Sequence, residues 1–191
     1  MNLEWIVIRG SGLVAFGLLA GATIWGLLLS TKLLGKAVRA KPLTYFHESL
    51  GLGALLATAV HMIALALDDY IDFGARELLL PGASLWRPLP VALGVMAFYA
   101  LTIVSLSFYF KRWIGQQAWR SIHFLSLGGF LATLIHGLTA GTDTTHPAVS
   151  AMYVASGSLV LTLVVVRILV SERSAQSRRL IPETNRDTAG R

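Results

Sequence analysis

The chain has 191 residues, of which 54% are hydrophobic and only 14% are charged, with no cysteine and a net charge of +6. A soluble domain carries charge on about a quarter of its residues, so this composition, with a mean hydropathy of +0.64, is typical of a membrane protein. The lack of cysteine excludes disulfides, cysteine-ligated zinc, iron–sulfur clusters, a thiol nucleophile and thioether-attached haem.

Five stretches without charged residues follow one another along the chain: residues 12–31, 49–67, 88–110, 121–142 and 144–166. Each is long enough for a helix that crosses about 30 Å of hydrocarbon, which takes ~20 residues. We therefore expect an all-α integral membrane bundle of five transmembrane helices, forming one domain over residues 1–171. Residues 172–191 are polar without an apolar period, which predicts a disordered cytoplasmic tail.

The basic residues are distributed unevenly between the two sides of this bundle. Thirteen of the 16 lie between the first and second helices, between the third and fourth, or after the fifth. Only Arg9, Arg76 and Arg87 lie on the other side. The positive-inside rule therefore predicts an outside amino terminus and an inside carboxyl terminus, with residues 68–87 along the outer interface. The basic residues then serve as anchors and contacts for membrane lipid, and we expect no binding of nucleic acid.

Four histidines lie near the ends of two of the expected helices: His47 and His61 on the second, His123 and His136 on the fourth. Ionisable residues at membrane depth usually mark functional sites. Both helices run outward, so His47 and His123 should share the cytoplasmic depth, with His61 and His136 ~20 Å further out. Two neutral imidazoles at one depth can hold a flat macrocycle from both faces. The pattern thus predicts two b-type haems, each with two histidine ligands to its iron.

The spacing of the ligands tests this interpretation. Fourteen residues return His61 to within ~40° of the face that carries His47, whereas thirteen leave His136 ~140° away from His123 on an ideal helix. We therefore expect the fourth helix to be tilted or locally distorted, and we expect the change of winding at Gly128 and Gly129.

Residues near the histidines allow two interpretations each. Small residues on both helices leave room for a porphyrin or simply pack the helices tightly: Gly51, Gly53, Ala54, Ala57, Ala59, Gly128, Gly129 and Ala132. Thr58 and Thr133 either orient the outer histidines or bond back to their own helix. Arg120 either neutralises an inner haem propionate or anchors the helix at the inner surface. His146 is expected in a loop or at a helix start.

Two motifs give the chain a resemblance to a known family. They are His47-x13-His61 and Trp119-Arg-x-x-His123-x12-His136-Gly137, the second followed by Ala140-Gly-Thr-Asp143. The chain resembles the ferric reductase-like transmembrane domain family, which includes ferric reductases, NADPH oxidase membrane domains and the haem subunit of bacterial methionine sulfoxide reductase systems. The resemblance covers roughly residues 40–170. That family usually has six helices with histidines on the third and fifth, whereas here the second and fourth of five carry them.

The resemblance implies two stacked b haems that carry electrons across a membrane, here a bacterial inner membrane. Many family members continue into a flavin and nicotinamide domain, for which the sequence after residue 171 has no room. The resemblance therefore implies an electron-transfer subunit of an oxidoreductase. Its donor would be a separate flavoprotein reductase or a quinol, and its acceptor an extracytoplasmic protein, metal or oxygen.

Other functions remain open from sequence alone. One is a cytochrome b-like, quinol-linked subunit of a larger complex. Another is a non-redox membrane protein, either a structural or assembly subunit or a pathway for a metal ion or proton. Such a pathway would be poorly lined, since residues 51–60 and 125–135 contain no charged side chain. No hydrolase triad, phosphate-binding loop, dinucleotide fingerprint or zinc signature is present, and no catalytic residue is predicted.

Overall fold

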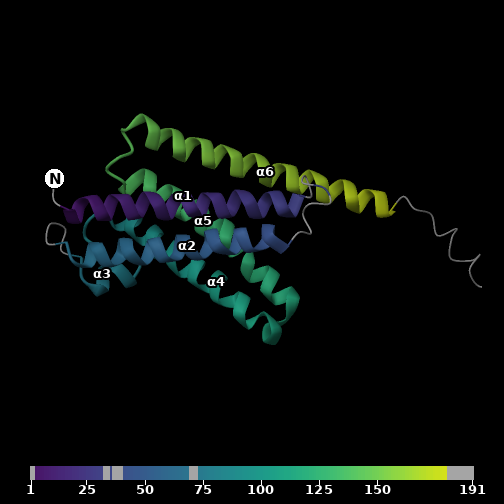
Figure 1. The fold of residues 1–191 in the computed structure, drawn as a ribbon, viewed down its shortest axis with the longest axis horizontal. Coiled ribbons are helices and arrows are strands. Elements are labelled where there is room, and N and C mark those ends of the chain that lie inside the picture. The colour runs from purple at the N-terminus through teal and green to yellow at the C-terminus, as the bar shows by residue number, and fades with distance from the viewer. Residues whose placement is uncertain (1–2, 32–34, 36–40, 69–72, 180–191) are drawn as a thin grey trace, which may run out of the picture.

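The computed structural model describes residues 3–31, 35, 41–68 and 73–179, with backbone only for 174–179. Within these ranges the protein is all-helical and contains no strand, which confirms the expected class. The helices are α1 (Leu3–Thr31), α2 (Lys41–Ala66), α3 (Ala75–Leu79), α4 (Pro88–His123), α5 (Leu125–Ala140) and α6 (Pro147–Arg179). Figure 1 shows the long helices running roughly side by side, with the short α3 at the end of the bundle where α1 begins.

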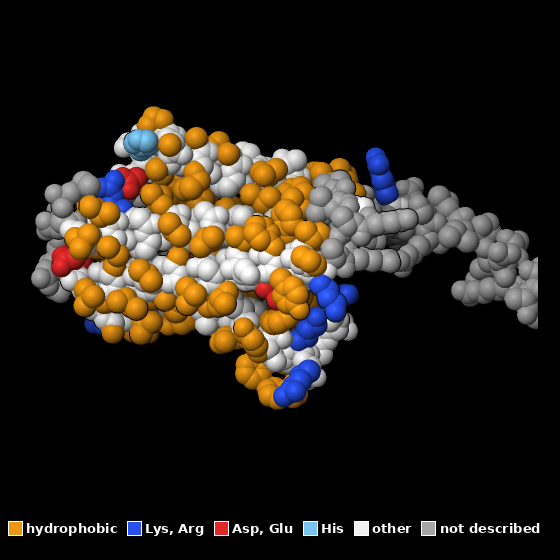
Figure 2. Space-filling view, viewed as in Figure 1, with side chains coloured by type: hydrophobic (Ala, Val, Ile, Leu, Met, Phe, Trp, Pro, Cys, Tyr) orange, Lys and Arg blue, Asp and Glu red, His pale blue; other side chains and the backbone are white. Residues whose placement is uncertain are grey.

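Four segments of the described chain are long and apolar enough to cross a membrane: Leu3–Thr31, Lys41–Ala66, Pro88–Ala140 and Pro147–Arg173. Their outward side chains are largely hydrophobic, and Figure 2 shows these side chains over most of the visible surface. An aqueous surface would not stabilise so much exposed apolar area, whereas lipid would. The protein is therefore a membrane protein.

The third of these segments contains both α4 and α5 and does not run straight. Gly115 has φ 82° and ψ 162°, values outside the helical region, and the chain turns there. Its positive φ suits glycine, which has no Cβ to clash. The two parts of the segment then pack against each other in opposite directions. Arg87 at the start of α4 donates a hydrogen bond to the carbonyl of Thr139 near the end of α5.

The antiparallel pair α1 and α2 forms the other half of the bundle. A Cβ on Gly21 would lie 3.7 Å from Leu50, and one on Gly53 would lie 3.3 Å from Leu18. The two residue numbers add up to 71 in both contacts, which fixes the register of the pair. α1 also contacts α5 and α6, so it is the central helix of the bundle.

The core forms where α1 meets α5 and α6. Phe16 is 1% exposed, and its ring centroid lies 4.5 Å from that of Tyr153 on α6 and 6.1 Å from that of Phe130 on α5. At one end of the bundle, Arg9 of α1 forms an ion pair with Asp143 between α5 and α6. These contacts join segments far apart in the sequence and thereby hold the histidine-bearing helices in place.

The described part of residues 68–87, the segment expected along the outer interface, packs on the bundle, where Phe73 and Leu78 are buried against Val91 and Val95 of α4. α6 continues as a helix to Arg179, eight residues into the expected tail, because residues 172–179 contain neither glycine nor proline to end it. Residues 180–191 of that tail lie outside the described residues.

Candidate functional site

The four histidines lie as two pairs, one pair toward each end of the bundle. The ring centroids of His47 on α2 and His123 at the end of α4 are 6.0 Å apart. His61 on α2 and His136 on α5 line one cavity and are close enough for their charges to interact. All four side chains are half-buried. The structure thus brings together the pairs that the sequence predicted.

Three of the four imidazoles are oriented by a backbone carbonyl of a neighbouring helix. Nδ1 of His47 lies 3.0 Å from the Ala22 carbonyl oxygen, and Nδ1 of His61 lies 2.9 Å from that of Ile8. Nδ1 of His136 lies 2.8 Å from the Pro90 carbonyl oxygen. A carbonyl oxygen only accepts hydrogen bonds, so each Nδ1 carries the proton and donates it. In a neutral ring this leaves the lone pair on Nε2 for a metal.

A glycine packs against each of these three rings. A Cβ on Gly26 would lie 2.9 Å from the His47 ring, one on Gly12 3.2 Å from the His61 ring, and one on Gly94 2.8 Å from the His136 ring. Sequence reasoning missed all three glycines. A signal was nevertheless present, since Gly12 and Gly26 are 14 residues apart on α1, the same spacing as His47 and His61 on the antiparallel α2.

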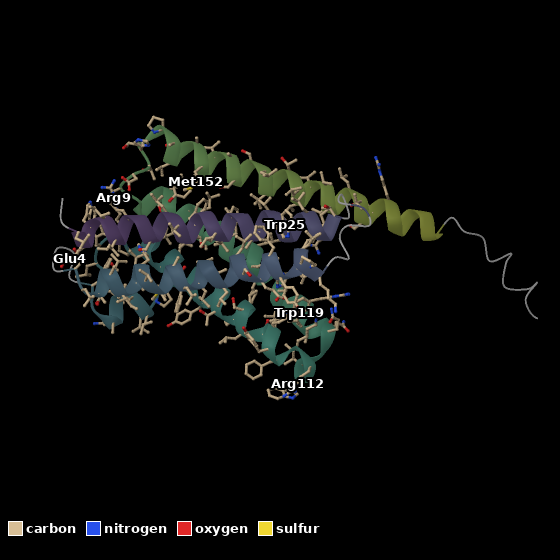
Figure 3. All side chains as sticks on the ribbon, in the orientation of Figure 1. Glu4, Arg9, Trp25, Arg112, Trp119 and Met152 are labelled. Carbon is tan, nitrogen blue, oxygen red and sulfur yellow. The ribbon has the colours of Figure 1, made fainter. Side chains whose placement is uncertain are left out.

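His123 is held differently. Its ring stacks on Trp119, with centroids 5.2 Å apart and planes at 27°, and Lys111 Nζ lies 4.0 Å from the centroid of the Trp119 ring. Within the described part of the chain His123 makes no hydrogen bond through Nδ1. The Trp119 Nε1 atom is buried there without a hydrogen-bond partner. Figure 3 shows Trp119 at the end of the bundle opposite Arg9.

The expected distortion between His123 and His136 is present, but at a different place. α4 ends at His123 and α5 begins at Leu125, so the break lies at Phe124; Gly128 and Gly129 lie inside α5. The Phe124 N–H is shared between the carbonyls of Arg120 and Ser121, and the Leu127 N–H donates to the Phe124 carbonyl, all at 3.2 Å, so the backbone here is partly of the tighter 3₁₀ type. Each 3₁₀ residue turns ~20° further than an α-helical one, which reduces the 140° mismatch.

The cavity between His61 and His136 lies at the end of the bundle that carries Arg9 and Asp143. The cavity volume is about 190 Å³. Pockets for organic cofactors have mostly apolar walls with a few polar groups, as this one does. Its apolar walls come from α1, α2, α4, α5 and α6, while its mouth includes the ion pair of Arg9 with Asp143.

The neighbouring residues can now be assigned. Thr58 and Thr133 each donate a hydrogen bond back to the carbonyl four residues earlier, at 2.8 Å, so neither orients a histidine. Gly53 and Gly129 have side chains of other helices against them, which supports the packing interpretation there. A Cβ on Gly51 or on Gly128 would meet nothing within 4 Å.

Two further predicted residues lie at the surface. Arg120 is exposed on α4, one turn before His123, in a position open to an anionic group of a ligand or of lipid. His146 is exposed immediately before α6, where its carbonyl accepts hydrogen bonds from Val149 and Ser150, as expected for a helix start.

Comparisons with protein-family models, with curated proteins and with solved structures found no match to this chain. The functional argument therefore depends on the geometry of the two histidine pairs. Among the described residues, no three His, Asp or Glu side chains gather as a protein metal site would require.

Proposed function

We propose that the protein carries electrons across a membrane through two b haems, one held by His47 and His123 and the other by His61 and His136. The observation that carries this proposal is the arrangement of four half-buried histidines as two pairs at opposite ends of an apolar bundle. Haem iron that cycles between the ferric and ferrous states would supply the redox chemistry. Two histidine ligands per iron leave no open position for a substrate, which favours electron transfer over catalysis at the iron.

The residues present fit such a group. The ring centroids of His47 and His123 are 6.0 Å apart, so these two imidazoles would be the residues that hold one haem iron. The outer pair lines a mostly apolar cavity. The protonated Nδ1 of His47, His61 and His136 leaves Nε2 as the ligand atom in each.

The proposal includes a topology and a direction of transfer. We count five crossings, because the segment Pro88–Ala140 reverses at Gly115, and place the carboxyl terminus in the cytoplasm by the positive-inside rule. Lys111 and Arg112 then mark the inner side: Lys111 lies over the ring of Trp119, on which His123 stacks, and Figure 3 shows Arg112 at this end. Arg120 lies there too, one turn before His123 on α4. Electrons would enter there from a flavoprotein reductase or a quinol and leave near His61 and His136 to an extracytoplasmic protein, metal or oxygen.

This topology and chemistry correspond to the ferric reductase-like family and to a bacterial inner membrane. The resemblance supports the assignment through the unequal spacings of 14 and 13 residues between paired histidines, and through Asp143 of the Ala140-Gly-Thr-Asp143 motif. The Asp143 side chain forms the ion pair at the mouth of the outer cavity.

The decisive measurement is an oxidised-minus-reduced visible spectrum of the full chain purified from membranes in mild detergent, with the haem-to-protein ratio. We expect about two non-covalent haems per chain with six-coordinate, low-spin spectra. A ratio of zero would refute the proposal and favour a non-redox membrane subunit.

Single substitutions of the histidines test the pairing. His61→Ala and His136→Ala should each remove the same component of a redox titration, while His47→Ala and His123→Ala should each remove the other. His146→Ala is the matched control, since this histidine is exposed and belongs to neither pair. Loss of one component by both His61→Ala and His123→Ala would refute the pairing.

A further inference from the structure

The same local arrangement holds three of the four histidines, although it occurs on two different helices. In each case Nδ1 of the ring donates to the carbonyl of one residue, and the ring packs on a glycine four residues later. The three arrangements are Ile8 and Gly12 for His61, Ala22 and Gly26 for His47, and Pro90 and Gly94 for His136. We call each of them a carbonyl–glycine seat.

The presence of a glycine in each seat has a physical explanation. In an α-helix the side chain at position i+4 leans toward the amino terminus and covers the carbonyl oxygen of residue i. Thr58 and Thr133 illustrate this, since their hydroxyl groups bond to the carbonyls of Ala54 and Gly129, four residues earlier. A glycine leaves that oxygen open to an imidazole from another helix. A Cβ would approach the ring to 2.8–3.2 Å, closer than ordinary van der Waals contact.

The seat matters because the surroundings supply almost no other acceptor. An N–H group without a partner in an apolar interior costs several kcal/mol, and the helix carbonyls are already bonded within their own helices. The second lone pair of such a carbonyl oxygen is therefore the acceptor that can take the hydrogen bond from Nδ1–H. A ring fixed in this way has one tautomer and one orientation, with Nε2 directed away from the seat.

We propose that Gly12, Gly26 and Gly94 are positioning residues that fix His61, His47 and His136 as Nε2 ligands, and that His123 has no such seat among the residues that the structure describes. This inference rests on the proposed function. α1 carries no ligand itself, yet it provides the seats for both histidines of α2.

Three alanine substitutions test this assignment: Gly12→Ala, Gly26→Ala and Gly94→Ala. Gly12→Ala and Gly94→Ala should weaken binding of the outer haem by about 10- to 100-fold and shift its potential, as is usual when a partner of a ligating histidine is lost. The inner haem should remain unchanged. Gly26→Ala should have the reverse effect. Haem content and a redox titration of each variant separate the two components.

Gly10→Ala and Gly17→Ala are matched controls on α1, the helix that carries Gly12 and Gly26, because a Cβ at either control position meets nothing within 4 Å. Alanine forms helices better than glycine, so a weakened helix cannot explain a loss. If Gly12→Ala or Gly26→Ala behaved like Gly17→Ala, the inference would be overturned while the proposed function stood. A wild-type protein without haem would instead refute the proposed function.

A second measurement uses the wild-type chain and covers the case in which a variant fails to fold. Histidine labelled with ¹⁵N in the reduced protein reports the exchange of each Nδ1–H with solvent. We expect slow exchange for His47, His61 and His136 and faster exchange for His123. Protection of His123 equal to that of the other three, or fast exchange at all four, would overturn the assignment.

Discussion

The ion pair of Arg9 with Asp143 connects α1 to the segment between α5 and α6, across 134 residues of sequence. Arg9 Nε donates to Asp143 Oδ2 at 2.6 Å, and Arg9 Nη2 faces Asp143 Oδ1, so the contact is bidentate. The side chains are 34% and 18% exposed, which places the pair between a surface and a buried ion pair. Removal of either partner should therefore loosen the end of the bundle that contains the outer cavity.

The size of the effect follows from this intermediate position. Exposed pairs contribute ~0.2–1 kcal/mol, whereas removal of one partner of a buried pair costs ~3–5 kcal/mol. We expect Asp143→Ala to lower the free energy of unfolding by about 2 kcal/mol, with a coupling energy between the two side chains of about 1–2 kcal/mol.

The assay is a double-mutant cycle of Arg9→Ala, Asp143→Ala and the double variant, unfolded reversibly in mixed micelles. The double variant should be less destabilised than the sum of the two single variants. Added salt should change the coupling only modestly, because the pair is partly buried. Additive single effects, within the ~0.5 kcal/mol expected of independent sites, would refute this account of the contact.

Three further results are expected. Phe16→Ala should destabilise the bundle by about 3–5 kcal/mol because its ring fills the core, whereas Val14→Ala, 54% exposed on the same helix, should cost less than about 1 kcal/mol in the same unfolding assay. Gly137→Ala should lower the midpoint of thermal unfolding, since its Cβ would lie 2.6 Å from the Tyr153 hydroxyl; an unchanged midpoint would show that Tyr153 moves aside freely. A reporter fused to the carboxyl terminus should be active only in the cytoplasm, and activity outside alone would contradict the proposed topology.

Much of the fold could be predicted from the lengths of the uncharged stretches, because lipid permits few alternatives to a helix. The start of α1 at Leu3 could not, since Glu4 and Arg9 interrupt the apolar pattern while leaving the helix intact. The reversal at Gly115 falls between the expected third and fourth helices, residues 88–110 and 121–142, as their opposite directions require. The continuation of helix on both sides of Gly115 was not expected, because Lys111, Arg112 and Arg120 interrupt the apolar pattern there.

The pairing of histidines could be predicted because it depends on depth alone, which residue spacing gives directly. The seats could not be predicted in this way, since they depend on the register between helices. Gly12 and His61 have residue numbers that add up to 73, as do Gly26 and His47, but this register becomes known only when α1 and α2 are seen side by side. The position of the break at Phe124 likewise depends on backbone hydrogen bonds that cannot be predicted from the residue types.

The exception at His123 follows from where this residue lies. It is the last residue of α4, next to Trp119 and Lys111, at the end of the bundle where Figure 3 shows Arg112. Water at that surface can accept a hydrogen bond from Nδ1, so a seat on another helix is not needed there to avoid the cost of an unsatisfied N–H. Its ring is instead held by stacking on Trp119, which restrains the plane of the imidazole but not its tautomer. Under the proposed function, the inner haem would therefore have one ligand fixed by a seat and one that is sensitive to the solvent at the cytoplasmic surface.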